Sequence, residues 1–320
     1  MDMVNINTIY NSEVCPMQRI FVCSALILGL NVSAMGIQTT FAQTEASTAV
    51  SPASQATQSL QFHQLSPNIY WVSGGVGNVG IIIGTQGVIV IDTTVSTDTA
   101  QQLLAGIKKI TDKPVTTVIL THEDADHVNG LTAFPANIEI IAQKNAAKNI
   151  ANSPTFANAA QYLPNHLIDQ QETIVRQGIT LKLLHWGPAH TAGDLIVYLP
   201  EQHTVFTGDI FTLNQPRTLI HYNKQGSSEG WVTNAQNILA LDADTFVVGH
   251  GDVQNKAGIA QRVKLVSDER NQIKTLVAQK KTLAEIQKIV GDPPPTPAGS
   301  PPPRFAPFSE VVYRELTEKK

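Results

Sequence analysis

The sequence contains almost no cysteine. Of its 320 residues only Cys15 and Cys23 are cysteines. If the N-terminal segment that holds both were removed, the remaining chain would have no disulfide and no thiolate metal ligand. Cys23 stands at the start of an apolar run rather than at its end, so we do not expect a lipid to be attached to it.

Long clusters of basic residues are also missing. Lysine and arginine number 22 against 26 aspartates and glutamates, which gives a net charge of −4. Pairs such as Lys108-Lys109 are typical of solvated helix faces. The electrostatic footprint of a nucleic-acid-binding protein is therefore absent, and we expect no nucleic-acid partner.

Only one apolar run is long enough to draw attention, and it lies near the N-terminus. Arg19 precedes the run from Ile20 to Met35, and Thr40-Phe41-Ala42 then offers small residues of the kind that a signal peptidase reads. We interpret residues 1–42 as a signal peptide, with Met17 as an alternative start. The expected location is the periplasm or the medium.

The alternative to a signal peptide is a membrane anchor. Asn31 and Ser33 interrupt the run, and it is short for a bilayer span. We therefore favour cleavage near Ala42, which leaves no stable membrane span.

The rest of the chain reads as one α/β domain with an extension. Residues 43–59 are rich in Ser, Thr, Ala and Gln and predict a flexible spacer. We assign 60–280 to the domain and 281–320 to a C-terminal extension, in which Pro293 to Pro303 cannot be regular helix and 309–318 suits a docking helix. Apolar runs bounded by turn residues predict strands at 68–72, 80–84, 88–92, 115–120, 138–142, 179–184, 195–199, 205–206 and 245–248.

Helical periodicity follows several of these strands. We expect helices at 96–110, after residue 142, at 229–241, at 256–279 and at 283–290. Each half of the chain is rich in strands first and helical later. This order predicts an αββα sandwich, in which two mixed sheets pack together and helices cover the outside.

The most informative motif follows the strand at 115–120. His122, Asp124, Asp126 and His127 are four good metal ligands within six positions. A strand that ends in imidazoles and carboxylates places them at the rim of a sheet, where a metal site can form.

Three later segments carry one such residue each on a glycine-containing turn beside a strand. They supply His190, Asp209 and His250. Each one alone is unremarkable, because a histidine after a strand is usually a hydrogen-bonded surface residue and a Gly-Asp pair is usually a turn. Glycine lets the backbone turn sharply beside an ion, and the order of the four motifs favours a metal site.

These motifs resemble those of the metallo-β-lactamase superfamily, over roughly Leu60 to Val253. The family motif is His-x-His-x-Asp-His, then a lone His, a Gly-Asp and a Gly-His. The resemblance implies two divalent ions, with zinc favoured and manganese or iron as alternatives. It implies that one ion binds His122, Asp124 and His190, that the other binds Asp126, His127 and His250, and that Asp209 bridges both.

The chain departs from the family motif at one ligand. Asp124 stands where the motif has its second histidine. A carboxylate can bind zinc but favours harder metals. Two divalent ions carry +4, and three aspartates cancel three of these charges, so a bound water is polarised less. A working dinuclear site, a site with one weak metal, and a degenerate site all remain open.

The resemblance also implies a hydrolase that acts on a small molecule. A metal-bound hydroxide would cleave an ester, thioester, lactone or β-lactam-type bond, and phosphoester cleavage also fits this chemistry. Asp126 and Asp209 would be the catalytic carboxylates, and Asp126 would hand a proton to the leaving group. Because Asp209 replaces the cysteine of two groups of true metallo-β-lactamases, the fold itself is weak support for antibiotic hydrolysis.

The substrate pocket is poorly encoded. Arg217, His221, Tyr222 and Lys224 follow Asp209, where they could hold an anionic group or form a solvated loop. Trp186 is either a pocket wall or a core residue. Asp92, at the end of a strand, is expected to fix a nearby loop. Four other histidines lack the strand-end context and are read as ordinary residues, namely His63, His166, His185 and His203.

Two other functions stay open. The first is iron-dependent oxidation of the persulfide-dioxygenase type, since those enzymes resemble this fold and Asp124 favours iron. The second is a non-catalytic protein with a degenerate metal site. The sequence does not indicate an oligomeric state.

Overall fold

The computed structural model describes residues 59–136, 138–294 and 305–318. The predicted signal peptide, nearly all of the predicted spacer and most of the proline-rich segment lie outside the described residues. In the part of the chain that is described, no helix has both the length and the hydropathy of a membrane span.

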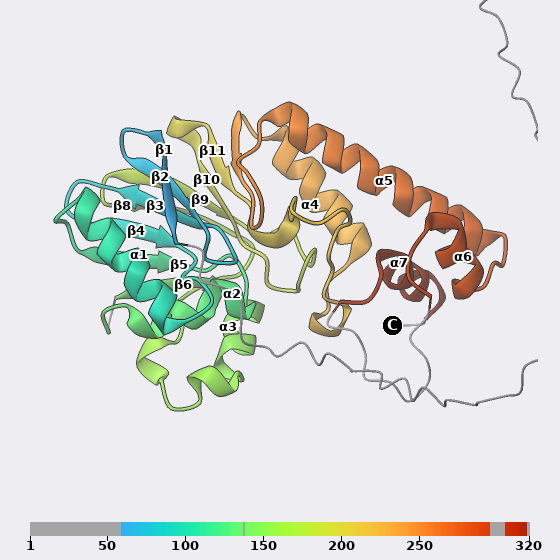
Figure 1. The fold of residues 1–320 in the computed structure, drawn as a ribbon, viewed down its shortest axis with the longest axis horizontal. Coiled ribbons are helices and arrows are strands. Elements are labelled where there is room, and N and C mark those ends of the chain that lie inside the picture. The colour runs from blue at the N-terminus through green and yellow to red at the C-terminus, as the bar shows by residue number, and fades with distance from the viewer. Residues whose placement is uncertain (1–58, 137, 295–304, 319–320) are drawn as a thin grey trace, which may run out of the picture. The chain divides into compact units, whose positions relative to one another are not determined.

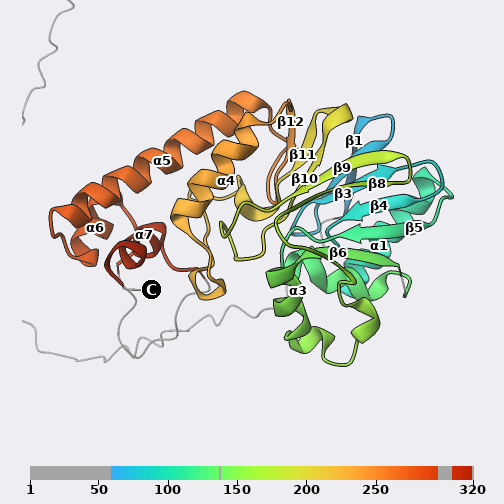
Figure 2. The same ribbon diagram turned by 180° about the vertical axis from the view of Figure 1, so that it is seen from behind.

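The strands form two sheets of seven and five strands (Figures 1 and 2). In spatial order the first sheet is β1-β2-β3-β4-β5-β6-β7, and the second is β12-β11-β10-β9-β8. The strands are β1 (Gln61–Ser66), β2 (Ile69–Ser73), β3 (Val79–Ile83), β4 (Val88–Ile91), β5 (Val115–Ile119), β6 (Glu139–Gln143), β7 (His166–Ile168), β8 (Gln171–Arg176), β9 (Ile179–Leu184), β10 (Ile196–Leu199), β11 (Thr204–Phe206) and β12 (Thr245–Val247).

Both sheets are mixed, which confirms that part of the predicted fold. In the first sheet β1 to β4 pair antiparallel, and β4 to β7 pair parallel. In the second sheet β8 to β11 pair antiparallel, and β12 pairs parallel with β11. The sequence patterns had not indicated β1, β7 or β8.

The helices occur where periodicity predicted them, apart from the one-turn α2. Their bounds are α1 (Thr97–Ile110), α2 (Ala125–Val128), α3 (Lys144–Ala151), α4 (Ser228–Ala240), α5 (Lys256–Ala278), α6 (Leu283–Val290) and α7 (Phe308–Thr317). The helix at the C-terminus, α7, packs against α4, α5 and α6.

Alternation along each strand explains the layers. In β4, Val88 and Val90 face a core shared with α1, while Ile89 and Ile91 face a second core between the two sheets. A strand buried on both faces reads as a continuous apolar run, which is why β4 was evident from sequence.

The second sheet is covered on its outer face by α4 and α5. Phe246 of β12 packs with Trp231 of α4 and Ile259 of α5, while its neighbour Val247 faces the core between the sheets. Figure 1 shows α1 on one side of the sheets and α4 and α5 on the other, which is the predicted αββα order.

Candidate metal centre

Seven side chains meet where strands of both sheets end. They come from the segment after β5, from the turn between β9 and β10, and from the turns after β11 and β12. The ligand atoms within each of two groups lie within 4.8 Å of one another. We call His122, Asp124, His190 and Asp209 the first donor group, and Asp126, His127 and His250 the second donor group.

The groups match the two predicted ligand sets, and Asp209 contacts both. Its Oδ2 lies 3.8 Å from His122 Nε2 and 3.3 Å from His250 Nε2. Its Oδ1 lies 3.2 Å from His127 Nε2. This is the position that a bridging carboxylate needs, so the geometry is compatible with the role that the resemblance implied for Asp209.

Each donor group is compact. In the first, Asp124 Oδ2 lies 3.4 Å from His190 Nε2 and 3.8 Å from His122 Nε2. In the second, Asp126 Oδ2 lies 3.2 Å from His250 Nε2 and 3.7 Å from His127 Nε2.

Three of the imidazoles are oriented by bonds on their outer nitrogen. His127 Nδ1 donates to Asp92 Oδ2 at 2.8 Å, and His190 Nδ1 donates to the Leu219 carbonyl at 2.9 Å. His122 Nδ1 contacts Thr121 Oγ1 at 3.0 Å. With Nδ1 engaged, Nε2 of each ring points to the centre, as in metal-ligating histidines.

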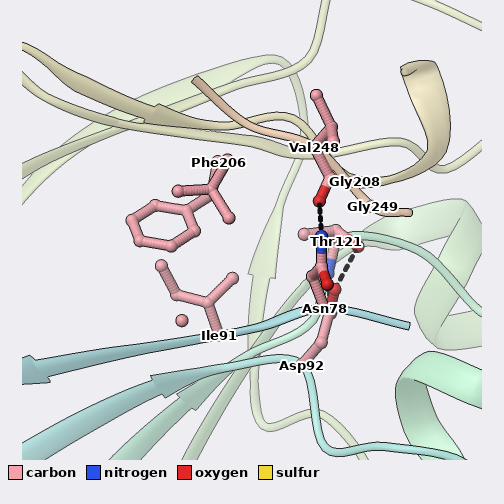
Figure 3. A pocket seen from close by; sticks show the side chains of 10 residues that line it. Asn78, Ile91, Asp92, Thr121, Phe206, Gly208, Val248 and Gly249 are labelled. Atoms are coloured by element: carbon pink, nitrogen blue, oxygen red, sulfur yellow. Dashed lines mark hydrogen bonds between the residues drawn. The ribbon is translucent and has the colours of Figure 1, made fainter. Parts of the chain in front are cut away.

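Asp92 holds the segment from Thr121 to His127, which we call the motif segment, in place, as expected. Its Oδ1 accepts from the Thr121 backbone at 2.8 Å and its Oδ2 accepts from Thr121 Oγ1 at 2.7 Å (Figure 3). These bonds are made in addition to the one from His127. The residue has a left-handed backbone, with φ of 63°. Aspartate tolerates this region better than most residues, so β4 can turn at once toward the site.

A second set of contacts fixes the turn that carries His250. Asn78 Nδ2 donates to the Val248 carbonyl at 2.8 Å (Figure 3) and to the Gly251 carbonyl, also at 2.8 Å. A Cβ at Gly249 would lie 1.9 Å from Asp209 Oδ1, so only glycine fits there. Asn78, Asp92 and their neighbours also line a small cavity of about 10 Å³, which has room for one water at most.

The turn that carries His190 is closed by Asp194, whose role sequence reasoning missed. Asp194 Oδ2 accepts from the backbone of Thr191 at 2.9 Å and of Ala189 at 3.2 Å. Burial raises the pKa of Asp194 to about 7. The Gly193-Asp194 pair was the available signal, but it is indistinguishable from an ordinary turn.

Charges within the centre are strongly coupled. Burial alone would lower the pKa of His190, but the hydrogen bond with Asp124 and the charge of Asp209 raise it to about 9. Burial would likewise lower the pKa of His250, and Asp209 and Asp126 raise it to about 9. Protons on these rings take the place of cation charge, so metal binding would release protons.

The donors fit a metal. His122, His127 and His190 are fully buried, and Asp124 is almost so. Among the described residues, His122 Nε2 has no hydrogen-bond partner. A buried polar atom without a partner needs a physical reason, and an ion at the centre would supply one.

Two of the four predicted substrate residues lie against Asp124. His221 Nε2 is 2.7 Å from Asp124 Oδ2, and Lys224 Nζ bonds to Asp124 Oδ1. Both come from the segment around the short 3₁₀ helix η6 (Tyr222–Lys224). Sequence reasoning selected these two residues for substrate contact and missed their bonds to Asp124.

The structure places the other two beside the C-terminal helices. Arg217 Nη1 lies 2.6 Å from Glu269 Oε1 and 2.5 Å from Asp292 Oδ1. Tyr222 donates its hydroxyl to Glu318 Oε2 at 2.8 Å.

The remaining candidates have local partners. Trp186 packs at the edge of the core under α4 and α5. His63 stacks on Trp71, with ring centroids 4.4 Å apart. His166 bonds to Glu139 and Glu172. His185 bonds to the Asp194 carbonyl, and His203 bonds to the Asp242 carbonyl.

Comparison with known families identifies this architecture. The family model described as the metallo-beta-lactamase superfamily matches residues 72–250, which is more than half of the chain. The match runs from β2 to the last of the seven donors, so it spans the centre.

Two distant curated relatives are each longer than the part that this chain matches. The chain is 28% identical over 192 residues to the 2,4-dinitroanisole O-demethylase subunit alpha of Nocardioides sp. (strain JS1661), covering 57% of this chain and 55% of that protein. It is 22% identical over 235 residues to the linear primary-alkylsulfatase of Pseudomonas sp. (strain ATCC 19151), covering 59% and 44%. The chain thus spans about half the length of these two relatives.

Solved structures agree with the fold. The sec-alkylsulfatase Pisa1 from Pseudomonas sp. superposes with a TM-score of 0.63 at 16% identity, over 81% of this chain and 50% of that one. The metallo-beta-lactamase from Pontibacter korlensis gives a TM-score of 0.55 at 20% identity, over 65% of this chain and 99% of that one.

Proposed function

The chain belongs to the metallo-β-lactamase superfamily, and we propose that it is a hydrolase that uses two divalent ions, with zinc favoured, to cleave an ester, thioester, lactone or β-lactam-type bond. The proposal depends chiefly on one observation, which is that two buried donor groups share Asp209. Ions bound there would lower the pKa of a water molecule and polarise the oxygen of the scissile bond.

The carboxylates divide the remaining work. Asp126 has the most exposed side chain of the three in the centre, at 12%, against 5% for Asp209 and 2% for Asp124. It is therefore the carboxylate best placed to reach a substrate and to pass a proton to the leaving group. Asp209, between the groups, would orient the donors around the attacking water.

A cavity beside the motif segment supplies a place for the substrate. It has a volume of about 280 Å³ and is lined by polar side chains that include Glu123, Asn149, Thr155 and Lys224. Lys224 lies between this cavity and Asp124, so a substrate held there would lie next to the first donor group.

The test is elemental analysis of protein purified without added metal, followed by a hydrolysis panel. The panel should hold lactones, thioesters, β-lactams and phosphodiesters, and also alkyl sulfates and 2,4-dinitroanisole because of the relatives' names. We expect turnover that a chelator abolishes and zinc restores. Turnover in the chelated, metal-stripped protein would refute the proposal, as would bound iron with oxygen consumption on a thiol.

We also propose that the chain is exported to the periplasm or the medium. The support is the sequence pattern of Arg19, the apolar run after it, and the small residues that end at Ala42. Expression of the full chain, fractionation of the cells and N-terminal sequencing of the product would test this. Cytoplasmic protein that keeps its N-terminus would contradict it.

A further inference from the structure

The carboxylate of Asp124 forms an ion pair with a lysine of a distant segment, Lys224. The carboxylate is almost completely buried, and both oxygens are engaged by one segment of the chain. Lys224 donates to Oδ1, and His221 lies 2.7 Å from Oδ2. A buried carboxylate needs a compensating charge, and the lysine ammonium provides one.

The segment that carries the lysine is held on two sides. The Ala192 backbone donates to the Lys224 carbonyl at 3.0 Å, which ties the segment to the turn of His190. The ring of Phe305 lies 4.1 Å from the ring of His221, and Glu318 accepts from Tyr222. The backbone of Lys224 is therefore fixed between the metal centre and the C-terminal residues.

The ammonium group of Lys224 has a second position available to it, in the cavity that its side chain lines. Lys224 carries its charge on a flexible four-carbon stem, and its side chain is 34% exposed. It also lines the cavity of about 280 Å³ beside the motif segment. The side chain can leave Asp124 for this cavity while its backbone stays in place.

We infer that Lys224 is an internal cation of the first donor group, which competes with a divalent ion for Asp124. An ammonium and a divalent ion on the same carboxylate repel each other. The second donor group therefore fills first, and the first donor group fills only when the ammonium has moved into the cavity. This inference depends on the metal groups of the proposed function, but it does not depend on which bond is cleaved.

The experiment counts metals. Apoprotein is titrated with Zn²⁺ by calorimetry, and bound metal is measured after dialysis, for the wild type, for Lys224→Met and for the control Lys148→Met, which changes an exposed lysine of α3. The wild type should bind one Zn²⁺ tightly and a second weakly. Lys224→Met should strengthen the weak step by roughly tenfold or more, since it removes one nearby positive charge. The control should resemble the wild type.

Two further variants assign the steps. His190→Ala should remove the weak step, and His250→Ala should weaken the tight one. Thermal unfolding of each apoprotein checks folding, and Lys224→Gln replaces Lys224→Met if that variant is unfolded. An unchanged weak step in the lysine variant would overturn the inference, and so would two equally tight steps in the wild type.

Failure of the inference can be told apart from failure of the proposed function. A wild type that hydrolyses the panel while Lys224→Met leaves both binding steps unchanged would refute only the inference. A chain with the expected shift in zinc binding and no turnover of any panel substrate would refute only the hydrolase proposal.

Discussion

The two donor groups contain similar side chains but are supported by different parts of the molecule. In the second donor group, His127 is fixed by Asp92 at the end of β4, and the turn of His250 is fixed by Asn78 just before β3. In the first donor group, Asp124 is held by His221 and Lys224, which belong to the short 3₁₀ helix η6 and its first flanking residue rather than to either sheet. Residues next to the first sheet thus position the second donor group. Asp124 of the first donor group depends on the segment around η6, which contacts C-terminal residues.

The largest effect should come from the residue that both groups share. Asp209→Asn removes the bridging charge but keeps the size of the side chain. We expect zinc affinity of both groups to fall by more than the roughly 100-fold that marks the upper range for outer partners of a ligand. Calorimetry with Zn²⁺ measures it. Loss of one binding step alone would show that Asp209 serves a single group.

Asp92→Asn should weaken the second donor group, whose His127 it contacts directly, more than the first, whose His122 it reaches only through Thr121. Asparagine tolerates the left-handed backbone of this position, so the fold should survive. The lost charge behind His127 should reduce zinc affinity of the tight step about 10- to 100-fold. Asp169→Asn, on the exposed surface, is the matched control. A weaker first donor group with an unchanged second would contradict the comparison.

Asp124→His should act on the first donor group alone. An imidazole suits zinc better than a single carboxylate oxygen, and we expect the weak step to gain about tenfold, or about 1.4 kcal/mol. Lys224 would then lose its partner, so the double variant with Lys224→Met should gain more. Unchanged affinity in both variants would show that residue 124 is not a ligand.

The smallest effect is expected for Glu139→Gln. This variant tests whether the free energy of unfolding can change without a change in zinc affinity. The hydrogen bond from Arg176 lowers the pKa of Glu139 from its ordinary 4.5 to about 2, against the effect of burial. Its stabilisation is therefore present above about pH 4.5 and is lost as the pH falls to about 2. Because the pair is partly exposed, Glu139→Gln should cost at most about 1 kcal/mol at pH 7.

Denaturant unfolding of the metal-free protein at pH 7 and at pH 3 measures this contribution. The difference between variant and wild type should shrink at the lower pH, while zinc affinity at pH 7 stays the same in both. A change in zinc affinity would mean that the start of β6, where Glu139 lies, influences the donor groups.

Much of the fold was predictable because a strand that is buried on both faces has a recognisable sequence, namely a continuous run of apolar residues. β4 is a continuous apolar run whose alternate residues enter two different cores, and in β5 Val118 and Ile119 likewise enter one core each. The edge strands β1 and β8 were missed, since only Ile174 among their residues is buried and their pairing is decided by a partner strand. The four-residue α2 is too short to show periodicity.

The donors were predictable for a related reason. Of their supports only Asp92 was expected to fix a loop, and its partners were not predicted. His122 to His127 form a local cluster after an evident strand. The bond between Asp92 and His127 joins residues 35 positions apart, and that between Lys224 and Asp124 joins residues 100 apart. No local pattern encodes such pairs, because the fold alone brings them together.

Gly249 has a consequence for how this protein can change. At position 124 the chain carries an aspartate in place of a histidine, and Lys224 from a distant segment compensates its charge. Residues 124 and 224 can therefore be replaced together. Position 249 offers no such latitude, because a single methyl group there would collide with the Asp209 carboxylate. Mutational drift can therefore alter the chemistry around residue 124, while position 249, beside the carboxylate that both donor groups share, admits nothing larger than a hydrogen atom.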